Sequence, residues 1–168
     1  MTPFEAVNEL RKRMNEKIIG QERIVDRFIM GLLADGHVLV EGLPGLAKTQ
    51  TVRAMSEVID AKFSRIQFTP DLQPSDVLGR EKVFYIEEKP VLQLEKGAIF
   101  GNIILADEIN RSPAKVQSAM LEAMEERQVT IAGKTYKLPE IFIVLATQNP
   151  KEQIGRHTSE LQSRGHLV

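Results

Sequence analysis

The chain has 168 residues, a length that suits one domain with a substantial core. Hydrophobic residues make up 42% and charged residues 27% of it, and the net charge of −1 gives no basic field that would favour nucleic acid. Cysteine is absent, which excludes disulfides and thiolate metal sites. No apolar run approaches the roughly 20 residues of a membrane span, and the first residues do not resemble a signal peptide. We therefore expect a soluble, cytoplasmic protein.

Two amphipathic helices are expected at the start of the chain. Residues 2–5, Thr-Pro-Phe-Glu, have the pattern of a capping box with proline at the first helical position. Apolar residues at helical spacing then carry this helix to about Asn15. After a short apolar kink at residues 18–21, a second apolar stripe over residues 24–33 predicts a helix that Gly36 ends.

Strand and helix patterns alternate from residue 37 to residue 146. Four apolar runs predict strands at 37–41, 63–68, 102–106 and 141–146. Helices are expected from about residues 48 and 112, hairpins over 82–94 and 129–138, and a proline-punctuated loop over 69–76. This alternation predicts an α/β fold, a mostly parallel sheet with helices on both faces.

A glycine-containing loop, Gly-Leu-Pro-Gly-Leu-Ala-Lys-Thr at residues 42–49, joins the first strand to the next helix. Glycines let backbone N–H groups approach an oxyanion, and the helix N-terminus adds N–H donors and a positive dipole end. Lys48 would reach the β- and γ-phosphates of a nucleotide, and the Thr49 hydroxyl would bind Mg²⁺. Ala47 replaces the last glycine of the usual pattern, so an ordinary helix-capping loop remains an alternative for this stretch alone.

Two adjacent carboxylates, Asp107 and Glu108, follow the buried strand 102–106. Ligands of open α/β sheets bind beyond the carboxyl ends of strands, so both should emerge beside the phosphate loop. Asp107 can hold Mg²⁺ through water, and Glu108 can polarise a water for in-line attack on the γ-phosphate. Adjacent like charges are unfavourable without a cation, which favours a metal nearby. A solvated acidic turn is the alternative.

A third strand end carries a neutral amide. The strand 141–146 runs into Thr-Gln-Asn-Pro at residues 147–150. Asn149 can hold the attacking water on the side opposite Glu108, although a turn residue before proline is the simpler interpretation. Three strand ends with complementary chemistry seldom coincide by chance, and together they predict a site for ATP and Mg²⁺.

These motifs resemble those of the MoxR family of AAA+ ATPases, which also has alanine before the lysine of the phosphate loop. The similar segments are the phosphate loop and residues 68–76, 104–115, 121–131 and 146–150. The resemblance implies a P-loop NTPase fold of the AAA+ type with two β-hairpin insertions. It covers residues 1–153, which we expect to be an incomplete nucleotide-binding core, followed by an unpatterned tail at 154–168.

The resemblance also implies which residues contact the nucleotide: the phosphate loop and a short segment that lies against the adenine. These residues are Ile19, Gly20, Gly42, Leu43, Pro44, Gly45, Leu46, Ala47, Lys48, Thr49 and Gln50. The expected catalytic residues are Lys48, Glu108 and Asn149. Thr49 and Asp107 are the expected metal ligands.

Partners are likewise implied by the resemblance. Such proteins form homo-oligomers, typically hexameric rings, whose hairpins, here 81–95 and 129–138, face the central pore. They act as chaperone-like remodellers of protein complexes, often beside a protein with a von Willebrand A domain. The arginine finger, fifth strand and lid of the family are not recognisable in 154–168, so a nucleotide-gated assembly module with little turnover is an alternative. A DNA-acting motor is less favoured because no basic stripe is present.

Other charged residues give weaker signals. Arg111 and Arg127 flank the helix that follows the acidic pair. Solvated helix-end charges are the simpler interpretation, and contact with a neighbouring subunit's nucleotide is the alternative. The histidines, His37, His157 and His166, lack the spacing of a zinc site.

Overall fold

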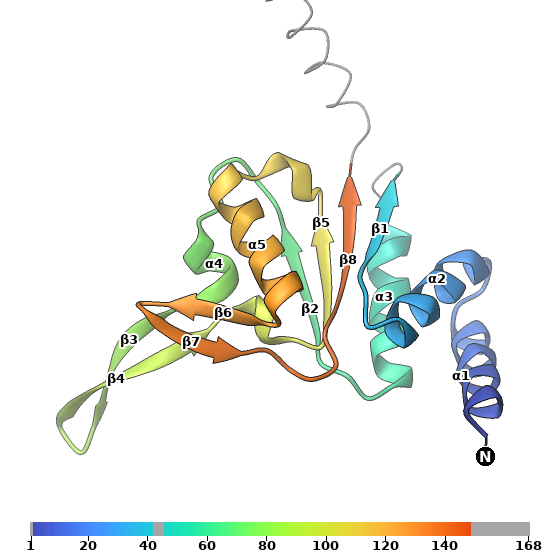
Figure 1. Cartoon of the computed structure of the whole chain (residues 1–168), viewed down its shortest axis with the longest axis horizontal. Helices are drawn as coiled ribbons and strands as arrows, with labels where there is room; N and C mark the ends of the chain where they lie inside the picture. The colour runs from blue at the N-terminus through green and yellow to red at the C-terminus, as the bar shows by residue number, and fades with distance from the viewer. Residues whose placement is uncertain (1, 42–45, 149–168) are drawn as a thin grey trace, which may run out of the picture.

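A parallel four-stranded sheet forms the centre of the molecule (Figure 1). The structure is a computed structural model that describes residues 2–41 and 46–148, apart from the side chains of 46–48. The strands lie in the order β1 (Val38–Glu41), β8 (Ile143–Gln148), β5 (Ile103–Asp107) and β2 (Phe63–Gln67), and all three pairings are parallel. The predicted fold class is confirmed.

Helices cover both faces of the sheet (Figure 1). On one face lie α1 (Pro3–Lys17), α2 (Glu22–Leu33) and α3 (Leu46–Val58), and on the other lie α4 (Pro74–Leu78) and α5 (Ala114–Glu126). Side chains alternate along β5, so Ile103 and Leu105 pack under α1–α3 whereas Ile104 and Ala106 pack under α4 and α5. Both faces of the strand are buried, which explains its unbroken apolar sequence.

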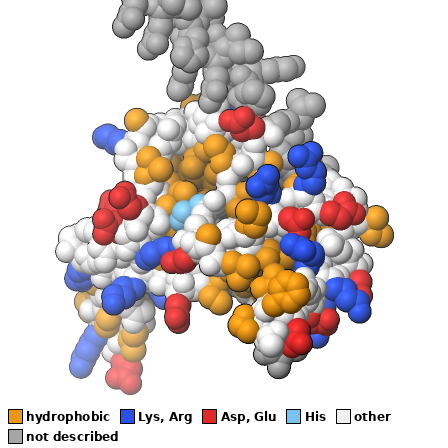
Figure 2. All heavy atoms as spheres, turned by 45° about the vertical axis from the view of Figure 1, so that its right-hand side comes forward, with side chains coloured by type: hydrophobic (Ala, Val, Ile, Leu, Met, Phe, Trp, Pro, Cys, Tyr) orange, Lys and Arg blue, Asp and Glu red, His pale blue; other side chains and the backbone are white. Residues whose placement is uncertain are grey.

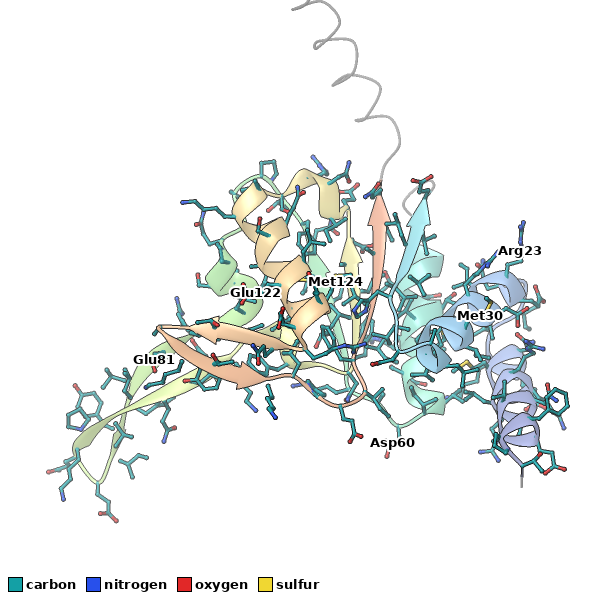
Figure 3. All side chains as sticks on the ribbon, viewed as in Figure 1. Arg23, Met30, Asp60, Glu81, Glu122 and Met124 are labelled. Atoms are coloured by element: carbon teal, nitrogen blue, oxygen red, sulfur yellow. The ribbon has the colours of Figure 1, made fainter. Side chains whose placement is uncertain are left out.

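Two antiparallel hairpins extend from the sheet on the α5 side (Figure 1). They consist of β3 (Gly79–Ile86) with β4 (Lys89–Lys96), and β6 (Gln128–Ile131) with β7 (Lys134–Lys137). Each turns through two residues with positive φ, Glu87–Glu88 and Ala132–Gly133, as tight hairpins require. Lys134 Nζ lies 2.7 Å from Glu81 Oε1 and joins the hairpins (Figure 3 labels Glu81 on β3).

Several predicted boundaries were wrong. The expected loop over 69–76 contains the start of α4, because Pro74 begins that helix and Asp76 accepts a hydrogen bond from the Gln73 N–H at 2.9 Å. Asp35, not Gly36, adopts the left-handed conformation after α2. The strand expected at 141–146 is displaced to Ile143–Gln148. Short 3₁₀ turns, η1 (Ala98–Phe100) and η2 (Ile109–Arg111), were not predicted.

The capping box at the N-terminus is confirmed. The Thr2 hydroxyl accepts a hydrogen bond from the Glu5 N–H, and the Glu5 carboxylate accepts one from the Thr2 N–H at 2.8 Å.

Among the described residues, no helix is long and apolar enough to cross a membrane.

Arg127 ties together three elements at the amino end of the sheet. It follows α5 with φ 54°, and its guanidinium donates hydrogen bonds to the carbonyl of Phe142 and to the carbonyl and carboxylate of Asp35. The guanidinium also lies 5.5 Å from the centroid of the Phe142 ring. The interpretation of Arg127 as a solvated helix-end charge was therefore wrong, because its role within this chain is structural.

His37 forms a second link at the same end. Its Nδ1 accepts a hydrogen bond from the Val144 N–H at 3.1 Å, so Nε2 carries the hydrogen and donates to the Met124 carbonyl at 3.1 Å (Figure 3 labels Met124 near the end of α5). Burial lowers the pKa of His37 below the usual 6.5. The hydrogen bond to the Met124 carbonyl raises this pKa in part, and the Arg127 and Asp35 charges lower and raise it by smaller amounts.

We expect His37 to make folding stability sensitive to mild acid. The unfolded chain takes up the proton near pH 6.5 but the folded chain only at lower pH, so stability is complete above pH 6.5 and falls as pH drops through the folded pKa. The free energy of unfolding should fall by up to about 1.4 kcal/mol per pH unit in this window. Urea unfolding between pH 7.5 and 5 would show it, and His37→Gln should flatten the difference. Equal slopes in both proteins would contradict this assignment.

Arg127→Ala should destabilise the fold by roughly 2–4 kcal/mol, since it leaves the carbonyls of Phe142 and Asp35 without this donor. The matched control is Arg80→Ala, which removes an exposed ion pair with Glu95 on the β3–β4 hairpin and should cost less than about 1 kcal/mol. Urea unfolding at pH 7.5 measures both. Similar losses in the two variants would show that Arg127 is no more than a surface charge.

Candidate functional site

The carboxyl ends of the four strands meet at one edge of the sheet. The strand register aligns Gln67 with Asp107, and Glu41 with Gln148. Only β8 separates β5 from β1, so two strand spacings, about 10 Å, lie between the strand that ends at Asp107 and the strand that leads into the phosphate loop. The acidic pair therefore lies at the edge of the sheet where β1 ends at Glu41.

Asp107 has hydrogen-bond partners on both neighbouring strands. Its Oδ1 accepts a hydrogen bond from the Thr147 hydroxyl of β8 at 3.2 Å. Its Oδ2 lies 2.8 Å from both Nε and Nη2 of Arg65 on β2. The Asp107 side chain is 15% exposed and that of Arg65 48% exposed. The strands thus hold this carboxylate in one orientation from both sides.

Glu108 is fixed by its backbone and its side chain. Its φ of 56° and ψ of 47° are left-handed, a conformation that costs a non-glycine residue roughly 1–2 kcal/mol and is often found at functional sites. Its N–H donates to the Thr147 hydroxyl at 2.9 Å. Its Oε2 accepts hydrogen bonds from Gln67 Nε2 at 3.1 Å and Arg111 Nη1 at 2.9 Å. These contacts stabilise the strained turn.

Cations of this chain lie beside both members of the acidic pair. Arg65 pairs with Asp107 and Arg111 pairs with Glu108, so each carboxylate has a cation from this chain. Arg111 is therefore not merely a solvated helix-end charge. Sequence reasoning also missed Gln67. The missed signal was the period-2 pattern of β2, which puts Arg65 and Gln67 on one face of that strand.

The site lies on the face of the sheet that α3 covers. Leu105, two residues before Asp107, packs in the core under α1–α3, as does Leu145, two residues before Thr147. Strand alternation therefore directs Asp107 and Thr147 toward this face. Because α3 packs on this face, its first turn and the Asp107 carboxylate lie on the same side of the sheet.

A pocket of about 310 Å³ borders the first half of α3. Its lining residues come from the end of α1, the segment after it, and α3: Lys17, Ile18, Ile19, Gln21, Gln50, Thr51 and Ala54. Ile19 is 91% exposed, so its side chain is open to contact with a ligand. The volume is at the lower end of the range for small-molecule pockets.

The predicted nucleotide contacts fall into three groups. Ile19 and Gln50 line this pocket, and Gly20, with φ 76°, lies between two lining residues. Leu46, Ala47, Lys48 and Thr49 form the first turn of α3, where alanine is a good helix former, so Ala47 does not argue against the loop. Gly42, Leu43, Pro44, Gly45, Asn149 and the tail 154–168 lie outside the described residues.

The residues present suit magnesium held together with a nucleotide. The described part of the chain contains no group of three or more His, Cys, Asp or Glu side chains that could hold a metal. Mg²⁺ characteristically binds one or two protein oxygens together with phosphates and water. One carboxylate, Asp107, and one hydroxyl, Thr49, match that donor set.

A second pocket, of about 400 Å³, lies at the opposite, amino end of the sheet. It is lined by Arg127, Lys137, Glu140 and their neighbours, and Arg127 is already bonded within the fold. Figure 2 shows hydrophobic side chains interspersed with charged ones on the face turned toward the viewer. The acidic pair and the α3 pocket remain the strongest candidate for a functional site.

Known proteins are similar to this chain over most of its length. The chain is 51% identical over 138 residues to chaperone MoxR1 of Mycobacterium tuberculosis, covering 82% of this chain and 36% of that protein. It is 49% identical over 146 residues to the uncharacterised protein YeaC of Bacillus subtilis, covering 87% of this chain and 45% of YeaC. The chain therefore spans less than half the length of these relatives.

A solved structure and a family model agree. The crystal structure of a protein from Cytophaga hutchinsonii, assigned as an ATPase, matches with a TM-score of 0.77 and 48% identity over 89% of this chain and 44% of that chain. The model of the ATPase family associated with various cellular activities (AAA) matches residues 37–163. The chain belongs to this family and, by its likeness to MoxR1, is a MoxR-type AAA+ ATPase.

Proposed function

We propose that this chain carries the nucleotide-binding core of a Mg²⁺-dependent AAA+ ATPase that remodels or assembles a protein complex. The main support is the arrangement of Asp107, Glu108 and Thr147, hydrogen-bonded together on the face of the sheet that carries α3. A carboxylate for the metal and a carboxylate for water, both beside a helix N-terminus, are the parts that phosphoryl transfer to water requires.

Each residue would have a distinct task. Lys48 and the backbone N–H groups of residues 42–49 would bind the phosphates, and Thr49 and Asp107 would hold Mg²⁺. The metal would neutralise charge on the β- and γ-phosphate oxygens. Glu108 would accept a hydrogen bond from the attacking water, and Asn149 would hold that water from the other side.

The α3 pocket is the proposed adenine site. The segment that contains Ile18, Ile19 and Gln21 forms one wall, and Gln50 and Ala54 of α3 form the other. An apolar wall suits the face of a base, and the neighbouring amide groups can bond its polar edge. The bound base would then cover the side chain of Ile19, which is exposed in the free protein.

The wider activity is part of the same proposal. A relative named as a chaperone, at 51% identity, supports a chaperone-like role, and we propose that the protein acts in the cytoplasm. The hairpins reach well beyond the sheet (Figure 1), and Tyr85 near the tip of the β3–β4 hairpin is 75% exposed, which suits contact with other proteins. We propose a homo-oligomer, as a hexameric ring, and a protein client that includes or accompanies a von Willebrand A domain protein.

A second candidate is a nucleotide-gated assembly module that binds ATP with little turnover. The observation that favours it is the engagement of Glu108 Oε2 by both Gln67 and Arg111, since these bonds restrain the carboxylate and make it a weaker acceptor for a water. Tight ATP binding without phosphate release by the parent chain would favour this candidate over the ATPase.

Lys48→Ala should weaken ATP binding at least tenfold, because it removes the cation expected at the phosphates. Glu108→Gln should keep ATP bound and lower turnover by roughly 10²-fold or more. Calorimetry and phosphate release measure the two effects. The controls are Lys12→Ala on α1 and Glu125→Gln on α5, both exposed and outside the site. Equal nucleotide binding by the parent, Lys48→Ala and Glu108→Gln would defeat the site assignment.

Ile19→Asp should weaken ATP binding roughly three- to tenfold and hardly change the melting temperature, because Ile19 is almost fully exposed in the free protein. Leu33→Asp is the matched control, since Leu33 is 64% exposed on α2 and does not line the pocket. Calorimetric titration with ATP compares the three proteins. If Ile19→Asp binds ATP as tightly as the control, the adenine does not lie in this pocket.

A further inference from the structure

Arg65 connects the two carboxylates of the proposed site through β2. Its Nε and Nη2 lie 2.8 Å from Asp107 Oδ2, and its Nη2 also donates to Gln67 Oε1 at 3.1 Å. The Gln67 amide is thereby oriented with its nitrogen toward Glu108 Oε2, at 3.1 Å. A continuous path of hydrogen bonds runs from Asp107 through Arg65 and Gln67 to Glu108.

Arg65 lies on the face of the sheet where the nucleotide is expected. It is in register with Leu105 of β5, and Phe63, two residues earlier on β2, packs in the core under α1–α3. Strand alternation therefore puts Arg65, Asp107 and the start of α3 on one side of the sheet. The guanidinium lies directly against the carboxylate that the proposed function assigns to magnesium.

Both oxygens of Asp107 are engaged in this arrangement. Oδ1 accepts a hydrogen bond from Thr147, and Oδ2 accepts one from Arg65 Nε and lies 2.8 Å from Arg65 Nη2. Because the Asp107 side chain is only 15% exposed, solvent screens this ion pair less than an open pair such as Arg80–Glu95, whose side chains are 66% and 41% exposed. A divalent cation that approaches Asp107 meets a neutralised carboxylate and a positive charge beside it.

We propose that Arg65 is a positioning residue that acts as the counter-ion of Asp107 in the nucleotide-free protein and yields it to magnesium only when nucleotide binds. The inference rests on the proposed function. The free site is thereby kept from holding a metal by itself, and the phosphates of a bound nucleotide supply the further oxygen ligands and negative charge with which Mg²⁺ can displace Arg65 from Asp107.

The test is the coupling between magnesium and nucleotide in the 168-residue chain. The affinity for a fluorescent ATP analogue is measured with excess Mg²⁺ and again in EDTA, and the ratio of the two is the coupling factor. In Arg65→Gln the ratio should rise roughly three- to tenfold, because Mg²⁺ no longer competes with a fixed cation for Asp107. The affinity in EDTA should remain close to that of the parent.

Three variants separate this role from a structural one. Arg65→Lys keeps the charge and should keep the coupling factor of the parent. Arg65→Met keeps the unbranched stem without the charge and should raise the coupling factor as Arg65→Gln does. It provides a second uncharged variant if Arg65→Gln lowers the stability of the fold. Arg53→Gln removes a cation from α3 that lies over the Phe63 ring and should leave the ratio unchanged.

The outcomes are distinguishable. A ratio that stays constant or falls in both Arg65→Gln and Arg65→Met overturns the inference, since Arg65 would then merely support Asp107 or bind the phosphates directly. If Arg53→Gln raises the ratio equally, the effect is one of general charge and the inference fails. Failure of the parent chain to bind the analogue under either condition overturns the proposed function, and this inference with it.

Discussion

The Thr147 hydroxyl is the contact on which the candidate site depends. It donates to the Asp107 carboxylate and accepts from the backbone N–H of Glu108, so one side chain at the end of β8 positions both residues of the acidic pair. Thr147 itself is 4% exposed and is fixed by the parallel pairing of β8 with β1 and β5. A hydroxyl can serve both contacts because it is a donor and an acceptor at once.

The sheet provides the rigidity that this contact needs. Ile103 to Ala106 alternate between two cores, and each core is closed by its own layer of helices. A strand buried on both faces cannot shift by one residue without exchanging its two sets of side chains. The strained backbone of Glu108 is therefore tolerated, because the strand before it and the bonds around it leave no relaxed alternative.

The two ends of the sheet have different tasks. At the amino end, His37 and Arg127 bond to backbone groups and join α5 to the start of β8 and to the connection before β1. At the carboxyl end, Arg65 and Arg111 bond to carboxylates that can exchange one cation for another. The backbone groups bonded at the amino end are held by the fold and keep their partners. Arginine is thus structural at one end of the sheet, whereas at the other end we propose that its pairing with a carboxylate can be exchanged.

Sequence patterns alone predicted the fold class, the strand that leads to Asp107 and the helix that carries Lys48, because apolar periodicity and glycine placement are local signals. They also indicated the family, through motifs that are contiguous in the chain. The identity of the cations that face the acidic pair became visible only in the folded structure. Arg65 is 42 residues from Asp107, and its partner is set by strand order and register. The start of α4 at Pro74 was missed because a single helical turn has no period to read. Side-chain pairing across a sheet is a non-local property, and no local pattern in β2 states which strand lies beside it.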